Sequence, residues 1–211
     1  MTKTANKGLG GGQEVTVSAI VLAAGRGTRM GRQKLLLPLE GKCLVQWAVD
    51  AALGAHVAVT IVVLGYEAQA VRAVLRDRRV KIVKNPDYVE GLSTSLKAGI
   101  RAARSDAGAA VFLLGDQPFV TPGMVDRLVE RFLETGALIV RPFVAGRPVH
   151  PVLVGATLFP ELLDERGDVG GRNVIERHAD RQVAVTWDSN QLPLDIDTPE
   201  DYDKALRQIE G

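Results

Sequence analysis

Cysteine is almost absent from this sequence of 211 residues, and net charge and long apolar runs are scarce as well. Cys43 is the only cysteine, which excludes an intramolecular disulfide and a thiolate metal cage. The formal net charge is +1, so no overall field attracts nucleic acid or an anionic membrane. No apolar run approaches the ~20 residues of a membrane-spanning helix. We therefore expect a cytoplasmic protein with neither nucleic acid nor a membrane as its partner.

The sequence does contain enough apolar material for one sizeable core. Hydrophobic residues make up 46% of the chain, which at this length favours a single domain. Segment 1–14 contains the run GLGGG and no hydrophobic stretch, so we expect a disordered leader there. Residues 15–211 would form the folded domain.

Apolar, β-branched runs alternate along the chain with stretches of helical spacing. The expected strands are Val17–Ala23, Val57–Leu64, Val80–Val83, Ala109–Leu114, Leu138–Val140 and Val183–Thr186. The expected helices are Leu44–Leu53, Ala68–Arg76, Leu92–Arg104, Pro122–Glu134 and Pro199–Ile209. This alternation predicts a single-domain, three-layer α/β/α fold with a mostly parallel, doubly wound, Rossmann-like sheet. Ligands of such sheets bind beyond the carboxyl ends of the strands.

The first expected strand leads into a basic, glycine-rich loop, VLAAGRGTRMGRQK. Gly25 and Gly27 fit a dinucleotide-binding fingerprint, but Met30 stands where its last glycine is needed. A Walker A loop also fails, because no Gly-Lys-Ser/Thr follows at the required spacing. What remains is a turn whose free N–H groups can approach phosphate oxygens, with Arg29 and Lys34 supplying mobile positive charge. A solvated basic turn is the alternative interpretation.

Acidic residues follow two other segments that we expect to be extended. Asp116 comes after the fourth expected strand, and Pro118 stops that strand from continuing regularly. Mg²⁺ takes one or two carboxylates plus substrate phosphates, so Asp116 is a candidate metal ligand, with a turn cap as the alternative. Asp195 and Asp197 alternate and should face opposite sides, so only one should reach a metal. Asp197 or Thr198 could instead cap the last helix.

Two further loops could bind substrate groups. Ser93 and Ser95 lie at a helix start after Gly91, where short hydroxyls and free N–H groups can bind base, ribose or phosphate. Segment 143–175 is broken up by glycines and prolines, and we expect it to face an acceptor substrate. Its candidates are Arg147 and His150, for which packing is the alternative, and the glycine-rich turn Asp168, Gly170, Gly171 and Arg172.

Several blocks of this sequence together resemble the MobA-like nucleotidyltransferases. The blocks are LAAGRGTRMGRQK, GLSTSLKAGI, LLGDQPFVT and GDVGGRNVI, and DIDTPEDY closes the match. The opening Leu-Ala-Ala-Gly is similar to the molybdenum cofactor cytidylyltransferase branch of that family, whereas the guanylyltransferase branch reads Leu-Ala-Gly-Gly. The resemblance implies CTP as nucleotide donor, and the methyl group of Ala24 would leave room for the smaller pyrimidine.

The resemblance also implies roles for individual residues. Lys34, Arg29 and Asp116 would be catalytic, and Asp116 with Asp197 would hold Mg²⁺, or Mn²⁺ in its place. The expected nucleotide-binding residues are Leu22, Ala23, Ala24, Gly25, Gly27, Gly91, Ser93 and Ser95. The expected acceptor-binding residues are Arg147, His150, Asp168, Gly170, Gly171 and Arg172.

The implied reaction transfers CMP from CTP to the terminal phosphate of molybdopterin or molybdenum cofactor and releases pyrophosphate. A molybdenum hydroxylase apoenzyme is the implied recipient of the product. Two alternatives stay open: a guanylyltransferase or other phosphate-acceptor transferase of the same fold, and a non-catalytic relative that binds nucleotide or cofactor. A nicotinamide-dependent oxidoreductase is disfavoured because its fingerprint is interrupted at Met30.

Overall fold

The computed structural model of the chain describes residues 15–27, 30–187 and 194–210, so the expected leader and Arg29 lie outside it. The strands are β1 Thr16–Ala23, β2 Pro38–Leu39, β3 Lys42–Cys43, β4 Val59–Leu64, β5 Lys81–Lys84, β6 Ala107–Leu114, β7 Ile139–Val144, β8 Arg147–Pro148, β9 Val152–Gly155 and β10 Gln182–Thr186. The α-helices are α1 Leu44–Gly54, α2 Ala68–Val74, α3 Leu92–Ala102, α4 Pro122–Thr135, α5 Phe159–Asp164, α6 Arg172–Arg177 and α7 Pro199–Glu210. Short 3-10 helices include η2 Lys34–Leu36, η3 Tyr88–Glu90 and η5 Gly167–Val169.

The main sheet has the strand order β10-β7-β9-β6-β1-β4-β5, and β8 pairs with β7 at one side. Strand β1 runs parallel to both of its neighbours, β4 and β6, and β7 runs parallel to β10. Strand β9 runs antiparallel to β6 and β7. The sheet is thus mostly parallel with one reversed strand in its interior, which confirms the predicted α/β fold class.

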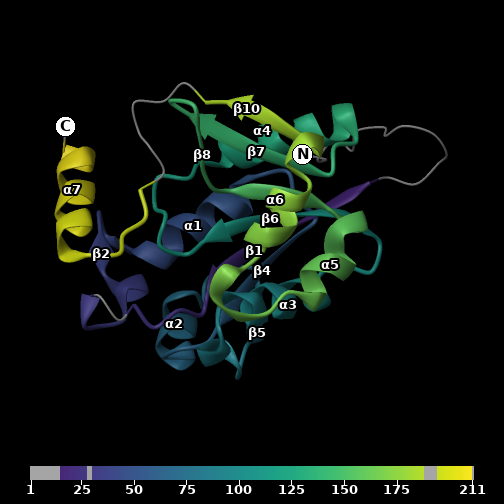
Figure 1. Cartoon of the computed structure of the whole chain (residues 1–211). Helices are drawn as coiled ribbons and strands as arrows, with labels where there is room; N and C mark the ends of the chain where they lie inside the picture. Colours follow the sequence, from purple (N-terminus) through teal and green to yellow (C-terminus); the bar gives the residue numbers. More distant parts are fainter. Residues whose placement is uncertain (1–14, 28–29, 188–193, 211) are drawn as a thin grey trace.

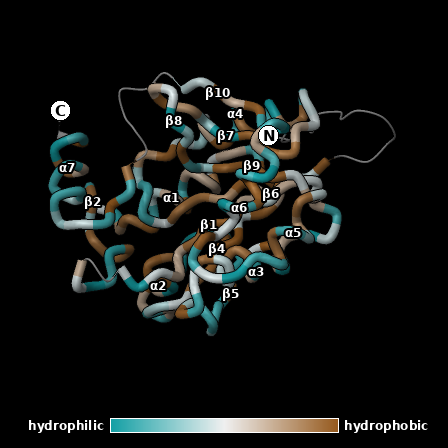
Figure 2. Tube along the Cα trace, in the orientation of Figure 1, coloured by the Kyte–Doolittle hydropathy of each residue, from teal (hydrophilic) through white to brown (hydrophobic). Residues whose placement is uncertain are grey.

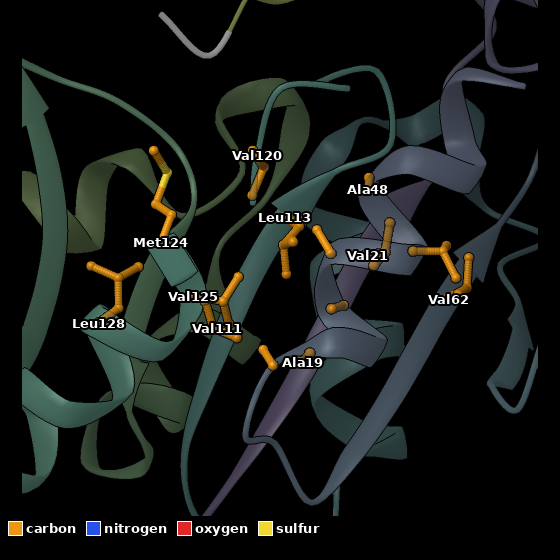
Figure 3. Packing of buried hydrophobic residues seen from close by; sticks show 14 of the residues in the cluster. Ala19, Val21, Ala48, Val62, Val111, Leu113, Val120, Met124, Val125 and Leu128 are labelled. Atoms are coloured by element: carbon orange, nitrogen blue, oxygen red, sulfur yellow. The ribbon is translucent and has the colours of Figure 1, made fainter. Parts of the chain in front are cut away.

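Helices cover both faces of this sheet (Figure 1). One core cluster joins the sheet to α1, α2 and α4, and it includes Val21, Leu113 and Leu128 (Figure 3). The cluster on the opposite face joins the sheet to α3, α5 and α6, and it includes Ile20 and Val174. Hydropathy colouring places the apolar residues along the inner strands and the polar residues on the outer turns of the helices (Figure 2).

A single glycine sets how closely α3 packs on the central strand. A Cβ placed on Gly99 would lie 2.4 Å from Cγ2 of Ile20 on β1. No side chain can be accommodated there without separating helix and strand. The close packing brings the start of α3 next to the carboxyl end of β1, where the glycine-rich loop begins.

The last helix covers neither face of the sheet. It lies at one side of the molecule beside β2 (Figure 1) and packs in a separate apolar cluster that contains Met30, Leu39, Ile196 and Ala205. This cluster ties the segment before α7 to the loop after β1. Among the described residues, no helix is both long and apolar enough to cross a bilayer.

The region 143–175 contributes more to the core than its glycines and prolines suggested. It contains β9, whose four residues are all buried between β6 and β7, as well as α5. The residues of this region that line the cleft, Asp168 and Arg172, lie in η5 and at the start of α6.

Candidate active site

A cleft of about 770 Å³ opens where β1 and β6 end, on the side where α3 begins. Predicted site residues that line it are Leu22, Ala23, Ala24, Gly25, Gly27, Lys34, Gly91, Ser95, Asp116, Asp168, Arg172 and Asp197. The cleft therefore lies at the carboxyl ends of parallel strands, where ligands of such sheets bind.

Lys34 occupies the floor of this cleft between two carboxylates. Its Nζ lies 2.5 Å from Oδ2 of Asp116 and 2.7 Å from Oδ1 of Asp197. Burial alone would lower the pKa of Lys34, but the charges and hydrogen bonds of these two aspartates outweigh burial and raise it. The amine is therefore a cation at neutral pH, and in this structure it is held by the two carboxylates instead of standing free in the loop.

The segment before α7 delivers Asp197 to this point. The backbone N–H of Ile196 donates to the carbonyl of Asp116 at 3.2 Å, which holds the two acidic segments together. Thr198 caps α7: its hydroxyl accepts from the N–H of Asp201, and the Asp201 carboxylate accepts from the N–H of Thr198. Of the two residues considered as helix cap, Thr198 takes that role, and Asp197 faces Lys34.

Asp195 also lines the cleft, so the expectation that Asp195 and Asp197 face opposite sides was wrong. The segment 194–197 is not part of a strand, and strand alternation does not apply to it. The Asp195 carboxylate accepts a hydrogen bond from Nε2 of Gln117. Loss of hydration raises the pKa of Asp195, the Gln117 amide opposes this, and the charges of Asp116 and Asp197 raise it further.

The donor set suits a hard divalent cation completed by substrate oxygens. Within residues 15–27, 30–187 and 194–210, no group of three or more His, Cys, Asp or Glu side chains is arranged as a metal site. Asp116 and Asp197 nevertheless converge on one point, because both contact the same nitrogen of Lys34. Two carboxylates plus phosphate oxygens are a usual ligand set for Mg²⁺, so these residues fit the predicted metal.

The glycine-rich loop forms the wall of the cleft beside Lys34. Gly27 has φ +60°, and a Cβ there would lie 3.1 Å from Cγ of Lys34 and 3.2 Å from the Arg32 carbonyl oxygen. Ala24 is buried, and its carbonyl accepts from the N–H of Tyr66 at 3.1 Å. The hydrogen bond from Tyr66 therefore fixes the start of the loop to the segment after β4. At Gly27 the backbone of the loop lies so close to Lys34 and Arg32 that a larger side chain would not fit without a shift.

The start of α3 forms the opposite wall. Gly91 precedes the helix with φ +115°, and a Cβ there would lie 2.5 Å from the carbonyl carbon of Gly167. Ser95 lines the cleft, and its hydroxyl accepts from the amide of Asn85 at 2.9 Å. Ser93 is buried and is not among the residues that line the cleft.

The residues predicted to bind the acceptor separate into different roles. Asp168 and Arg172 line the cleft, and Asp168 also accepts from the N–H of Leu92 at the start of α3. Gly170 and Gly171 pack closely against leucines, since a Cβ on either would lie 2.9 Å from a Leu92 or Leu162 methyl group. Arg147 is exposed on β8, His150 is partly buried, and neither belongs to the lining of the cleft.

The sequence reading missed several residues near the cleft. Tyr88 and Arg26 both line it, and the guanidinium of Arg26 lies 5.5 Å from the centre of the Tyr88 ring. Asn85 is buried and donates to both Thr94 and Ser95. Asn85 could have been selected from the sequence, because it is a polar residue directly after the strand β5.

Fold and site together define a nucleotide-binding α/β enzyme with paired acidic residues facing a glycine-rich loop. The family described as MobA-like NTP transferase domain matches residues 19–183. The chain belongs to this family and is a nucleotidyltransferase. The predicted resemblance is thereby confirmed at the level of the family.

Among the relatives of known name, three examples match nearly the whole chain. The molybdenum cofactor cytidylyltransferase of Escherichia coli (strain K12) is 29% identical, over 88% of this chain and 93% of the relative. The purine catabolism protein PucB of Bacillus subtilis (strain 168) is 32% identical, and the nicotine blue oxidoreductase of Paenarthrobacter nicotinovorans is 31% identical. Each of these two matches covers 90% of this chain and 96% of the relative.

Solved structures show the same fold. The Rv0371c homolog from Mycobacterium sp. strain JC1 has a TM-score of 0.84 at 32% identity, covering 92% of this chain and 96% of its own. A manganese complex of Rv0371c from Mycobacterium tuberculosis H37Rv has a TM-score of 0.77 at 30% identity, covering 92% and 99%. A nucleotidyl transferase from Methanothermobacter has the same TM-score, identity and coverage.

Proposed function

We propose that this enzyme transfers a cytidylyl group from CTP to the terminal phosphate of a molybdenum-cofactor-type acceptor and releases pyrophosphate. The observation that carries the proposal is the convergence of Asp116 and Asp197 on Lys34, beside a glycine-rich loop. Transfer of a nucleotidyl group to a phosphate brings two anionic groups together, and these repel each other. An enzyme for this reaction must position both phosphates and neutralise their charge, which a lysine and two metal-binding acids beside a glycine-rich turn can do.

The chemistry needs little beyond positioning and charge neutralisation. An oxygen of the acceptor phosphate attacks the α-phosphorus, the bond from that phosphorus to the bridging oxygen breaks, and pyrophosphate leaves with that oxygen. The acceptor phosphate is already ionised at neutral pH, so the step does not require a general base. Lys34 neutralises charge on the departing pyrophosphate, and the free N–H groups of the loop bind its oxygens.

Asp116 and Asp197 would hold Mg²⁺, or Mn²⁺ in its place. When bound, a divalent cation supplies positive charge beside the phosphate oxygens at the site of attack. Lys34 would then exchange its contacts with the two carboxylates for contacts with phosphate. The manganese complex of a structural neighbour with 30% identity supports the use of a divalent metal.

CTP is favoured over GTP by the residue at position 24. Ala24 is buried at the wall of the cleft, so its methyl group takes up space that a glycine would leave open. The name of the Escherichia coli relative supports the same nucleotide and the same acceptor. A molybdenum hydroxylase apoenzyme is the recipient that this function would serve.

A matrix of nucleotides and acceptors with pyrophosphate detection tests the proposal. CTP, GTP and ATP are each mixed with Mg²⁺ and with molybdopterin, molybdenum cofactor or a simple sugar phosphate. We expect pyrophosphate from CTP with a pterin acceptor only. Release with GTP would indicate a guanylyltransferase, and binding of nucleotide without release would indicate a non-catalytic relative.

A matched pair of variants controls this experiment. Asp116→Asn removes one of the converging carboxylates, whereas Asp126→Asn removes an aspartate that contacts His56 outside the cleft. We expect turnover to be lost in the first variant and retained in the second. Equal activity of both would contradict the proposed site.

One relative is named an oxidoreductase, so a redox function is the second candidate. Its readout is the oxidation of NADH or NADPH by the purified enzyme in the presence of electron-accepting dyes. Dye reduction without pyrophosphate release from any nucleotide would replace the transferase proposal.

A further inference from the structure

Arg26 is a cation of the cleft that has no acidic partner. It follows Gly25 in the glycine-rich loop, lines the cleft and is exposed. No ion pair or hydrogen bond joins its guanidinium to any residue in the described part of the chain. Lys34, by contrast, is held by two carboxylates. Within that part of the chain, the N–H donors of Arg26 are available for an anion that enters the cleft.

Tyr88 holds the guanidinium of Arg26 in place without using its donors. The guanidinium lies 5.5 Å from the centre of the Tyr88 ring, whose face attracts the positive charge but takes no N–H group in an ordinary hydrogen bond. The ring itself packs tightly, since a Cβ on Gly65 would lie 2.7 Å from Cβ and Cγ of Tyr88, and the centre of the Tyr66 ring is 6.5 Å away. Arg26 is thus positioned by a fixed surface at the edge of the cleft.

Sheet topology places Arg26 and Lys34 at different points along a ligand. Tyr88 packs on Gly65, which directly follows β4, whereas Asp116, a partner of Lys34, comes after β6. Strands β4 and β6 flank β1 on opposite sides. Neighbouring strands are about 4.8 Å apart, so roughly 10 Å separates the ends of β4 and β6 laterally. A chain of phosphates is long enough to contact both cations, whereas a lone phosphate contacts one of them.

We propose that Arg26 binds an oligophosphate chain at a phosphate other than the one beside Lys34, and that Tyr88 is the positioning residue that holds Arg26 ready for it. The glycine-rich turn supplies backbone N–H groups along the same chain, because Gly25 and Gly27 flank Arg26. The pair thereby selects a triphosphate over a monophosphate. This inference deepens the proposed function, on which it rests for the reaction but not for the binding.

Isothermal titration calorimetry with Mg²⁺ and inorganic pyrophosphate, CTP or CMP measures this binding without an acceptor. Arg26→Gln should weaken binding of pyrophosphate and CTP by roughly tenfold or more, because charge-assisted hydrogen bonds are lost, and should leave CMP binding almost unchanged. Tyr88→Leu should weaken binding of the same two ligands roughly two- to fivefold, and Tyr88→Phe, which keeps the ring, should bind them as wild type does. The double variant Arg26→Gln/Tyr88→Leu should bind no more weakly than Arg26→Gln alone, since Tyr88 acts through Arg26.

Lys42→Gln is the matched control for Arg26→Gln. Lys42 forms the other cation–π contact among the described residues, 4.8 Å from the centre of the Trp47 ring, and it lies outside the cleft. This variant should bind pyrophosphate, CTP and CMP normally.

Several results would overturn the inference. Equal weakening of CMP and CTP binding in Arg26→Gln would mean that Arg26 contacts the base, the ribose or the inner phosphate. Fully additive losses in the double variant would mean that Tyr88 does not position Arg26. Weaker binding of a simple sugar phosphate, with CTP binding unchanged, would place Arg26 at the acceptor instead.

Two further results separate this inference from the proposed reaction. Wild-type affinity of Arg26→Gln for pyrophosphate and CTP would overturn the inference and leave cytidylyl transfer standing if pyrophosphate is still released from CTP and acceptor. Affinity that depends on Arg26 and on the outer phosphates, without transfer to any acceptor, would support the inference and overturn the proposed reaction. No binding of pyrophosphate or CTP by wild type would overturn both.

Discussion

Lys34 joins two carboxylates that come from distant parts of the sequence. Its amine belongs to a residue that is only 9% exposed, and it contacts Asp116 and Asp197 at hydrogen-bond distance. Two partly buried carboxylates this close together would repel each other without a cation between them. The lysine therefore holds the acids together, in addition to the phosphate contact that we propose for it.

Replacement of Lys34 by alanine tests this double role. We expect kcat to fall on the order of 10²-fold or more, because a preorganised charge at the leaving group is lost. The bare carboxylate pair should bind Mn²⁺ more tightly than the wild-type pair, since the metal no longer competes with an amine. Pyrophosphate release and Mn²⁺ titration measure the two effects.

Lys42 provides the control for that variant. It also contacts an aspartate, Asp50, at 2.7 Å, but at a surface outside the cleft. Lys42→Ala should retain normal turnover and normal Mn²⁺ affinity. Near-normal turnover of Lys34→Ala would remove Lys34 from the catalytic residues.

His150 should make the stability of the protein depend on pH. Its pKa is about 4 in the folded state, below the ordinary value near 6.5, so at intermediate pH the unfolded chain binds a proton that the folded chain does not. Stability should therefore fall as pH drops from about 6.5 to 4, by on the order of 2–3 kcal/mol from this group. Urea unfolding of wild type and His150→Gln at pH 7 and 4.5 isolates the contribution.

The exposed His56 supplies the comparison, because its side chain is 72% accessible. His56→Gln should lose stability on acidification as wild type does. An equal loss in His150→Gln would show that His150 is not held neutral by its surroundings.

The sequence predicted Asp116 because it closely follows a strand, whereas Asp197 was selected by the family resemblance. Asp116, Lys34 and Asp197 were selected from sequence, and the structure brings the three together. Tyr88 was not selected, because an aromatic residue in the segment before a helix gives no local signal that it lines a cleft. Loop residues such as Gly170 resembled ligand-binding residues, yet their contacts are with leucines, since glycine serves close packing as well as phosphate approach.

The start of α3 depends on close contact between two loops. Gly91 combines φ +115° with a 2.5 Å approach of any Cβ to Gly167. The Asp168 carboxylate accepts from the first helical N–H, at Leu92, and so stabilises the positive end of the helix. Helix α3 and the loop before α6 therefore form one unit at the mouth of the cleft.

Gly91→Ala should separate these two loops. We expect the free energy of unfolding to fall by about 1–3 kcal/mol from backbone strain, with a further loss from the clash. KM for the nucleotide should rise, because both walls of the cleft shift. Urea unfolding and steady-state kinetics measure the two consequences.

Gly136→Ala is the matched control for this element. Gly136 also has positive φ, at +62°, but it ends α4, and no described atom lies within 4 Å of the point where its Cβ would be. Gly136→Ala should lower the free energy of unfolding only through backbone strain, and KM for the nucleotide should stay unchanged. A similar loss of stability in both variants would mean that the contact with Gly167 contributes little.

Helices and strands whose apolar residues repeat regularly were predicted from the sequence. Elements that form only because of contacts with distant parts of the chain were not. Strand β4 and helix α4 were found within two residues of their observed bounds, because their apolar patterns are long and regular. Strand β9 was missed, since Val152–Gly155 is short and follows a segment that contains two prolines. Its pairing with β6 and β7 on both sides supplies the hydrogen bonds that make it a strand.

At the scale of the whole molecule, the cleft is assembled from the loop after β1, the start of α3 and the segment 194–197. A ligand that contacts all three should stabilise the fold as a unit. At a concentration of CTP with Mg²⁺ near 100 times Kd, we expect about 2.7 kcal/mol of stabilisation. For a domain of this size the melting temperature should rise by roughly 5–10 °C.

Differential scanning fluorimetry measures this shift, with Asp116→Asn as the variant expected to lose it. GTP and ATP at equal concentration should produce smaller shifts. Equal shifts from all three nucleotides would contradict selection of the base at Ala24.

The fold and the reaction class could be predicted, whereas the acceptor could not. Alternating strands and helices define the sheet, and the spacing of glycines and acids defines a phosphate site. The candidate acceptor residues that line the cleft, Asp168 and Arg172, meet the glycine-rich loop only after the chain has folded, so no run of sequence encodes the acceptor. The relatives differ accordingly in their names, which include a cytidylyltransferase, a purine catabolism protein and an oxidoreductase.

The position of Asp197 near the end of the sequence also determines when a newly synthesised chain can become catalytically active. A ribosome adds this residue after every strand of the described sheet, and the apolar cluster around Ala205 must then dock on the loop after β1. A nascent chain with a complete sheet still has only one of the two acids at Lys34. Catalysis would therefore begin only with the final helix, and a chain that ends before Asp197 would leave Lys34 with one carboxylate and the apolar cluster around Leu39 uncovered.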